Sequence, residues 1–142
     1  MRLAKPSGGV VQNVFLVVID SSSLNQLTNE RYMALKPTIY KLKIALSDLD
    51  RNIYEALSLT IAQHPSETLE RMMVRVLAYC INWQEGINFT KGLSEPDEPD
   101  ICAYTLDDRL LLWLDVGKPA ADRIKKATHA ANEAKVYSLI YN

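Results

Sequence analysis

Two aspartates at the ends of a predicted β-hairpin are the residues of this chain best suited to chemistry. Asp100 closes an acidic loop that contains Pro96 and Pro99, and Asp115 ends an apolar strand just before Gly117. Because two strands joined by a short turn bring their far ends together, we expect these carboxylates to converge. Two carboxylates can hold a hard divalent cation such as Mg²⁺. The alternative is that Asp100 and Asp115 are an ordinary loop acid and an ordinary strand-end acid.

Strand and turn patterns predict the elements that would position these aspartates. The hairpin strands are mainly apolar, and Asp107 and Asp108 between them favour a turn. Two upstream segments alternate apolar and polar residues around a turn cluster, which predicts a second antiparallel hairpin. The last expected strand is apolar on both faces and is therefore predicted to be central and buried. The expected strands are residues 38–46, 54–63, 87–90, 102–106, 110–116 and 135–141.

A first helix is expected between the two hairpins. Pro65 suits its first turn, and Ser66 is a good N-cap. Helical geometry places Glu70 at the edge of the apolar stripe, and Glu67 lies farther round, toward solvent. Arg71 and Arg75 share the polar face. The apolar stripe of this helix consists of Leu69, Met72, Met73, Val76, Leu77 and Cys80.

A second helix is expected to begin at Pro119, with Ile124 facing the core. Its narrow apolar stripe consists of Ala120, Ile124, Ala127 and Ala131. Arg123, Lys125 and Lys126 lie on its flanks and outer face. The whole element order is then β-β-α-β-β-β-α-β. This order predicts an α/β fold in which a mixed β-sheet is flanked by two helices.

Composition narrows the functional classes. The 142-residue chain is 48% hydrophobic with a net charge of −1, so we expect one folded domain without a global attraction to nucleic acid. The apolar run at residues 10–19 is too short to span a bilayer, so no membrane association is expected. Cys80 and Cys102 lack metal-ligand spacing, and His64 and His129 lie far apart, which argues against a zinc site. The absence of a disulfide pattern favours a cytoplasmic location.

Several long motifs span residues 33–142. They are Met33-Ala-Leu-Lys-Pro-Thr-Ile-Tyr-Lys41, Asp48-Leu-Asp-Arg51, His64-Pro-Ser-Glu-Thr-Leu-Glu-Arg-Met-Met-Val-Arg75, Phe89-Thr-Lys-Gly-Leu-Ser94, Asp97-Glu-Pro-Asp100, Leu112-Trp-Leu-Asp-Val-Gly117 and Arg123-Ile-Lys-Lys-Ala127. Together these motifs resemble the YaeQ family of bacterial proteins. Family members have no counterpart of residues 1–32 and continue beyond Tyr141. The resemblance therefore implies a YaeQ-like α/β domain at 33–142, truncated at its C-terminus. Residues 1–32 would be an extension that is disordered or that reflects a mis-assigned start, with Met33 as the true start.

The resemblance also implies a restriction-endonuclease-like PD-(D/E)XK core and assigns candidate site residues. Pro99 and Asp100 would form the PD element, and Asp115 would be the second acid. Gly117 stands where the lysine is expected, so Lys125 or Lys126 would have to replace that lysine. Glu67 or Glu70 would be the additional helix acid, and Mg²⁺ would be the cofactor, held by Asp100 and Asp115.

Two functions follow from this resemblance. The first is a divalent-metal-dependent nuclease or phosphodiesterase, in which carboxylates hold the metal and a lysine activates water. The alternative is a non-catalytic nucleic-acid-binding or regulatory module on the same fold. In that case the contacts would come from a basic surface formed by Arg71, Arg75, Arg123, Lys125 and Lys126.

Overall fold

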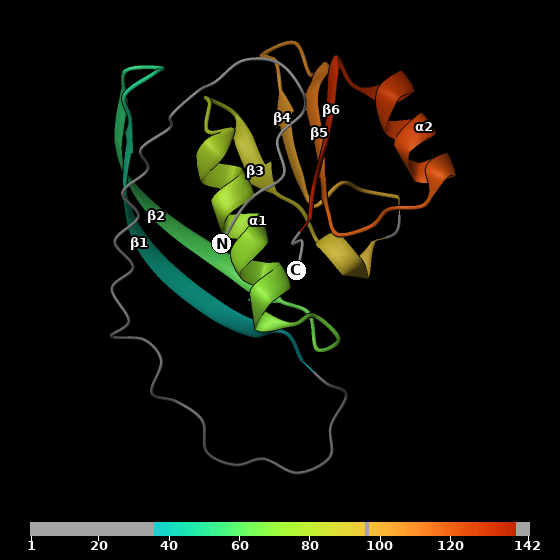
Figure 1. Cartoon of the computed structure of the whole chain (residues 1–142), viewed down its shortest axis with the longest axis horizontal. Coiled ribbons are helices and arrows are strands. Elements are labelled where there is room, and N and C mark those ends of the chain that lie inside the picture. The colour runs from blue at the N-terminus through green and yellow to red at the C-terminus, as the bar shows by residue number, and fades with distance from the viewer. Residues whose placement is uncertain (1–35, 96, 139–142) are drawn as a thin grey trace. The chain divides into compact units, whose positions relative to one another are not determined.

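The structure, a computed structural model, describes residues 36–95 and 97–138, and these divide into two units. The described part of one unit is residues 36–65, and the other unit begins at Ser66 (Figure 1). The predicted extension at residues 1–32 and the proposed start at Met33 lie outside the described residues. Neither described helix combines the length and the apolar character needed to cross a bilayer.

The first unit is a long antiparallel hairpin, as the alternation predicted. Strands β1 (Thr38–Asp48) and β2 (Ile53–Gln63) pair without a register shift from Thr38 opposite Gln63 to Asp48 opposite Ile53. The turn is closed by Asp48, whose Oδ1 accepts the N–H groups of Asp50 and Arg51 at 3.1 Å each. The Asp48 Oδ2 accepts the Arg51 side chain. A carboxylate that bonds backbone groups two and three residues ahead is a common way to fix a turn.

The second unit is an α/β fold with two helices and a four-stranded mixed sheet, which confirms the predicted α/β class. The prediction of a single sheet is wrong, since β1 and β2 form a separate two-stranded sheet. The strand order is β3-β4-β5-β6; the first three strands are antiparallel, and β6 runs parallel to β5. Figure 1 shows α1 and α2 on opposite sides of this sheet. The elements are α1 (Leu69–Ile81), β3 (Ile87–Phe89), a 3₁₀ turn η1 (Gly92–Ser94), β4 (Ile101–Tyr104), β5 (Leu110–Val116), α2 (Ala121–Ala130) and β6 (Glu133–Tyr137).

The core of this unit forms between α1 and the central strands. Leu112 and Leu114 of β5 are almost completely buried, and so are Ile101 and Ala103 of β4. Strands alternate their side chains, so Trp113 and Asp115 must face the opposite side of β5 from Leu112 and Leu114. That side is the one on which Arg123 of α2 meets both Trp113 and Asp115. The alternation of β5 therefore separates an apolar face from a face that carries an acid.

The start of α1 differs from the prediction. The N-cap is Thr68 instead of Ser66, and its Oγ1 accepts the N–H of Arg71 at 3.1 Å. Leu69, predicted in the buried stripe, is 53% exposed because it is the first residue of the helix. The buried side is instead widened by Val74 and Ala78. Because the cap is Thr68, Glu67 precedes the helix, and this changes the direction of its side chain at the candidate site.

Two predictions for the C-terminal elements are wrong. Ile124 of α2 is 42% exposed, and Ala127 is the buried residue of this helix. The last strand lies at the edge of the described sheet instead of its centre, and its Val136 is 45% exposed. Apolar residues on both faces of a strand are therefore insufficient evidence for a central position. Residues 139–141 of the predicted strand lie outside the described residues.

Candidate functional site

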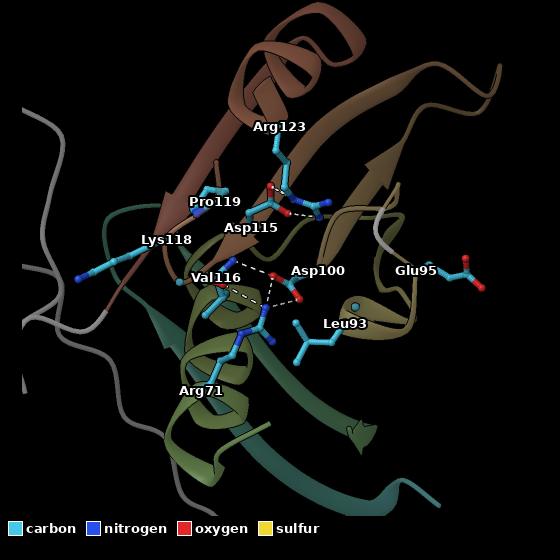
Figure 2. A pocket seen from close by; sticks show the side chains of 11 residues that line it. Arg71, Leu93, Glu95, Asp100, Asp115, Val116, Lys118, Pro119 and Arg123 are labelled. Carbon is cyan, nitrogen blue, oxygen red and sulfur yellow. Dashed lines mark hydrogen bonds and ion pairs between the residues drawn. The ribbon is translucent and has the colours of Figure 1, made fainter. Parts of the chain in front are cut away.

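A pocket of about 400 Å³ lies in the α/β unit where β5 ends and β4 begins (Figure 2). Its lining includes both predicted metal-binding aspartates, Asp100 and Asp115. It also includes three basic residues, Arg71, Lys118 and Arg123. The structure thus brings the two acids to one pocket together with compensating positive charge.

The backbone of the hairpin explains why Asp100 reaches this pocket. Asp100 directly precedes β4, and its N–H donates to the carbonyl oxygen of Leu114 at 3.0 Å. Its own Oδ2 accepts the N–H of Val116 at 2.8 Å. The Asp100 side chain therefore continues the ladder between β4 and β5 beyond the last paired residues. As a result, the carboxylate is 3% exposed and lies beside the end of β5.

Arg71 of α1 places one nitrogen among three oxygens at this position. Its Nη2 donates to Asp100 Oδ1 at 2.9 Å, to Asp100 Oδ2 at 2.8 Å and to the Val116 carbonyl oxygen at 3.0 Å. Figure 2 shows the guanidinium group directed at this carboxylate. Burial opposes the charge on Arg71, but the attraction of Asp100 and Glu67 outweighs it and raises the pKa of the guanidinium above its ordinary value.

Asp115 is held in a similar way by α2. Arg123 donates from Nε to Oδ2 and from Nη2 to Oδ1, both at 2.8 Å, which is a two-point pair. Trp113 adds a hydrogen bond from Nε1 to Oδ2 at 3.0 Å. The guanidinium carbon of Arg123 also lies 5.7 Å from the centre of the Trp113 ring, within the range of a cation–π contact. The hydrogen bonds to Asp115 raise the pKa of Arg123 above its ordinary value.

Glu67 was predicted to point toward solvent, and this prediction is wrong. The side chain is 1% exposed. Its Oε1 accepts Arg71 Nη1 at 2.6 Å and Arg75 Nε at 2.9 Å, and its Oε2 accepts Arg75 Nη2 at 2.7 Å. Because Thr68 is the cap, Glu67 precedes the helix and its side chain can turn back along the first two turns. Glu67 therefore holds arginines instead of facing the pocket.

The other candidate acid and the two candidate lysines lie away from the pocket lining. Glu70, Lys125 and Lys126 are all exposed. The Nζ of Lys126 binds Asp97 Oδ1 at 2.6 Å, and this hydrogen bond lowers the pKa of Asp97 below its ordinary value. The structure therefore does not bring Lys125 or Lys126 beside Asp100 and Asp115.

The proposed basic surface is also largely used for internal pairing. Arg75, predicted on the polar face, is 3% exposed and is bound to Glu67, which corrects that prediction. Arg71 and Arg123 are bound to the two aspartates, and Lys126 is bound to Asp97. Lys125 is exposed on α2. Arg71 and Arg123 therefore matter as pocket residues, a role that the sequence pattern did not reveal.

Lys118 is a pocket residue that the sequence analysis missed. It directly follows Gly117, which stands where the PD-(D/E)XK motif expects lysine. A lysine displaced by one residue from the expected position was the signal that could have identified Lys118. Gly117 has a φ of 111°, which favours glycine, and its N–H donates to the Tyr137 carbonyl oxygen at 2.7 Å. Figure 2 shows the Lys118 side chain directed away from Asp100 and Asp115. Among the described residues, no lysine forms an ion pair with either carboxylate.

Gly92 explains one of the sequence motifs. Its φ is 56°, and a Cβ atom there would lie 3.1 Å from Asp100 Oδ1 and 3.5 Å from Arg75 Nη1. Its N–H donates to Thr90 Oγ1 at 3.1 Å, and Thr90 in turn donates to the Pro99 carbonyl oxygen. The segment at residues 89–94 thus packs its backbone against Asp100, and glycine is the residue that fits both the space and the conformation.

The oxygen atoms around Arg71 Nη2 provide a test of whether a divalent cation suits this pocket. Arg71 Nη2 is a positively charged donor surrounded by Asp100 Oδ1, Asp100 Oδ2 and the Val116 carbonyl oxygen. These are hard oxygen ligands of the kind that Mg²⁺ prefers, and Asp115 lines the same pocket. Within residues 36–95 and 97–138, no three His, Cys, Asp or Glu side chains form a metal-binding group. One or two carboxylates, completed by water and substrate phosphate, are nevertheless a usual set for Mg²⁺. The donor chemistry therefore fits.

Comparison with known proteins identifies relatives of this chain. Residues 33–142 match the model of the family described as YaeQ protein. "Uncharacterized protein YaeQ" of Escherichia coli (strain K12) is 47% identical over 108 residues, and that of Salmonella typhi is 46% identical over the same length. Each match covers 75% of this chain and 59% of the relative, so the chain spans about three-fifths of their length.

Two solved structures share this fold. The crystal structure of YaeQ protein from Pseudomonas syringae matches with a TM-score of 0.70 at 45% identity, covering 72% of this chain and 57% of that one. The crystal structure of YaeQ protein from Xanthomonas axonopodis pv. citri matches with a TM-score of 0.67 at 42% identity, covering 70% of this chain and 56% of that one.

Proposed function

Because this chain belongs to the YaeQ family and has two motif carboxylates in one pocket, we propose that it is a divalent-metal-dependent phosphodiesterase or nuclease. The observation that carries the proposal is the position of Asp100 and Asp115. They lie at adjacent ends of β4 and β5 and line the same pocket with Arg71 and Arg123. An acid pair surrounded by arginines suits a phosphodiester bound together with a metal ion.

The order of elements supports a PD-(D/E)XK-like core for this enzyme. The α/β unit runs α1-β3-β4-β5-α2-β6, the α-β-β-β-α-β order expected for that core. Pro99 and Asp100 directly precede β4, where the PD element is expected, and Asp115 lies on the next strand. The lysine of the motif is replaced by Gly117, so this chain departs from the pattern at one of its three chemical positions.

The proposal assigns roles to five pocket residues and to Glu67 behind them. Asp100, Asp115 and the Val116 carbonyl oxygen would hold Mg²⁺. A bound Mg²⁺ supplies charge neutralisation for the phosphodiester and a more acidic water molecule. Arg71 and Arg123 face the pocket and would bind phosphate oxygens, for which a planar guanidinium is well shaped. Glu67 keeps Arg71 at the pocket through its bond to Nη1.

The arginine pairs also support a second candidate function, a nucleic-acid-binding or regulatory module without cleavage. Both carboxylates are engaged by guanidinium groups, Lys118 is directed away from them, and Lys126 binds Asp97. A pocket of this kind binds phosphate by its arginines and lacks a lysine to activate water. Binding of a phosphodiester without its hydrolysis would distinguish this module from the enzyme.

The two candidates can be separated by one assay. Fluorescently labelled single- and double-stranded DNA and RNA would be incubated with the protein and with MgCl₂ or MnCl₂, and both binding and cleavage would be followed. The variants are Asp100→Asn, Asp115→Asn and, as a matched control, Asp97→Asn, because the Asp97 side chain is 92% exposed in the same acidic loop. Circular dichroism would establish that each variant is folded.

Cleavage that requires metal, is lost in Asp100→Asn and Asp115→Asn and persists in Asp97→Asn would support the phosphodiesterase. Binding without cleavage, weakened in the same two variants, would support the binding module. A folded wild-type protein that neither binds nor cleaves these substrates would contradict both functions.

A further inference from the structure

One guanidinium nitrogen of the pocket lies among three oxygens of the kind that Mg²⁺ prefers. Arg71 Nη2 lies within 3.0 Å of both Asp100 carboxylate oxygens and of the Val116 carbonyl oxygen. This nitrogen carries two N–H groups and shares them among three oxygens, whereas Arg123 pairs two different nitrogens with the two oxygens of Asp115. The two arginines of the pocket therefore hold their carboxylates differently.

We propose that Arg71 is an internal cation that competes with the divalent metal for Asp100 and the Val116 carbonyl oxygen. The inference rests on the proposed metal-dependent function, and it adds that Arg71 controls the affinity of the pocket for the metal. In the absence of metal, Arg71 neutralises the buried Asp100. When metal binds, the two positive charges cannot share the same three oxygens, so Arg71 must release them.

The surroundings of Arg71 determine where it goes after release. Its Nη1 is bound to Glu67 at 2.6 Å, and Glu67 is itself fixed by Arg75 through two bonds. Glu67 therefore holds the guanidinium at the wall of the pocket while Nη2 becomes available. A released Nη2 is a charged donor without its former carboxylate, and a phosphodiester oxygen is a suitable new partner.

Exchange of Arg71 from a carboxylate to a phosphodiester couples two ligands. A phosphodiester that binds Arg71 stabilises the released state and so strengthens metal binding, and by linkage the metal strengthens phosphodiester binding by the same factor. Without the phosphodiester, the wild-type protein binds Mg²⁺ weakly because Arg71 must first be displaced. The site would then assemble fully only when substrate is present.

The test compares Mg²⁺ binding by the wild type, Arg71→Gln and Lys118→Gln. Lys118→Gln is the matched control because it removes the same charge from the same pocket, but its side chain is directed away from Asp100 and Asp115. Isothermal titration with MgCl₂ would be performed with and without dimethyl phosphate, a minimal phosphodiester. Thermal unfolding would be recorded for each protein with and without MgCl₂.

We expect Arg71→Gln to bind Mg²⁺ at least about tenfold more tightly than the wild type, since charge-assisted hydrogen bonds to Asp100 no longer compete. Without metal, its unfolding midpoint should lie below that of the wild type because Asp100 loses its partner, and MgCl₂ should restore the midpoint. Lys118→Gln should bind Mg²⁺ about as tightly as the wild type does. Dimethyl phosphate should strengthen Mg²⁺ binding by the wild type and have less effect on Arg71→Gln.

Three results would overturn the inference. Suppose that Mg²⁺ binding by the wild type requires Asp100 and Asp115, but that Arg71→Gln binds Mg²⁺ no more tightly than the wild type. The competition would then be absent, although the proposed metal site would stand. If none of the folded proteins binds Mg²⁺, both proposals fail. If Arg71→Gln does not fold even with MgCl₂, the wild type decides. The competition predicts that dimethyl phosphate strengthens its Mg²⁺ binding, and an unchanged affinity would refute it.

Discussion

Replacement of Glu67 by glutamine should destabilise the protein strongly, although the helical pattern alone places this residue toward solvent. In the structure the Glu67 side chain is 1% exposed and that of its partner Arg75 is 4% exposed. Three arginine nitrogens donate to its two carboxylate oxygens. Glutamine has almost the same shape but lacks the charge, and its amide nitrogen would face arginine donors. Arg75 would then be a buried positive charge whose partner is a neutral amide with a single acceptor oxygen.

The magnitude follows from the burial of this pair. Removal of one partner from a buried ion pair costs about 3–5 kcal/mol. The remaining amide oxygen of glutamine can still accept one hydrogen bond, which contributes about 1 kcal/mol. We therefore expect Glu67→Gln to lower the free energy of unfolding by about 2–4 kcal/mol. Urea unfolding at neutral pH, followed by circular dichroism, measures this difference directly.

Glu70→Gln is the matched control, since Glu70 is an exposed acid in the first turn of the same helix. Exposed ion pairs contribute about 0–1 kcal/mol, so this variant should remain within about 1 kcal/mol of the wild type. If Glu67→Gln were as stable as Glu70→Gln, Glu67 would be solvated as its helical position suggested. The described network of Glu67, Arg71 and Arg75 would then be wrong.

Three further predictions concern other parts of the chain. Gly92→Ala should lower the free energy of unfolding by at least about 1–2 kcal/mol, because alanine is strained at a φ of 56° and its Cβ would lie 3.1 Å from Asp100 Oδ1. Urea unfolding measures this effect, and an unchanged unfolding midpoint would contradict the prediction. Burial opposes the charge on Asp48, but the hydrogen bonds from Arg51 outweigh this and lower the pKa of the carboxyl below its ordinary value. The resulting stability is present above the unfolded-state pKa and is lost as the pH falls through the lower folded-state pKa. Asp48→Asn should therefore cost about 1 kcal/mol at pH 7 and little once the wild-type carboxyl is protonated, and a difference that persists unchanged into acid would refute the assignment. Burial raises the pKa of the Cys80 thiol to about 11. Iodoacetamide at pH 8 should therefore alkylate Cys80 far more slowly in the native protein than in urea. Equal rates would show that this thiol is accessible in the native protein.

The parts of the fold that depend on local patterns were predicted from the sequence. Alternation identified β1 and β2, and the Asp107–Asp108 turn signal identified the hairpin of β4 and β5. Because hairpin geometry fixes which strand ends meet, the sequence also indicated that Asp100 and Asp115 would approach each other. The register of antiparallel strands is thus a long-range relationship that can be inferred from short-range signals.

The features that were missed depend on tertiary contacts. Which of Ser66 and Thr68 caps α1 decides whether Glu67 faces solvent or folds back on Arg71 and Arg75, and both residues are good caps. Charged residues are usually assigned to solvent, so the helical pattern placed Arg75 on the polar face. Its partner Glu67 allows it to be buried.

The pattern of the second helix was also insufficient. The periodicity of α2 placed Ile124 and Ala127 in one apolar stripe, but of these two residues only Ala127 is buried. Its most informative residue is Arg123, which reaches Asp115 and packs over Trp113. Such a contact depends on how the helix lies against the face of β5 that carries the acid. That arrangement is set by packing and cannot be read from helical periodicity.

Anomalous diffraction from a crystal soaked in MnCl₂ would test most directly whether Asp100 and Asp115 form one metal site. Mn²⁺ is a suitable substitute for Mg²⁺ because both prefer oxygen ligands. The account predicts a manganese peak in the pocket bound by both carboxylates and by the Val116 carbonyl oxygen, with Arg71 moved off Asp100. A saturating soak that leaves no manganese there, with Arg71 and Arg123 still paired to the two aspartates, would contradict it.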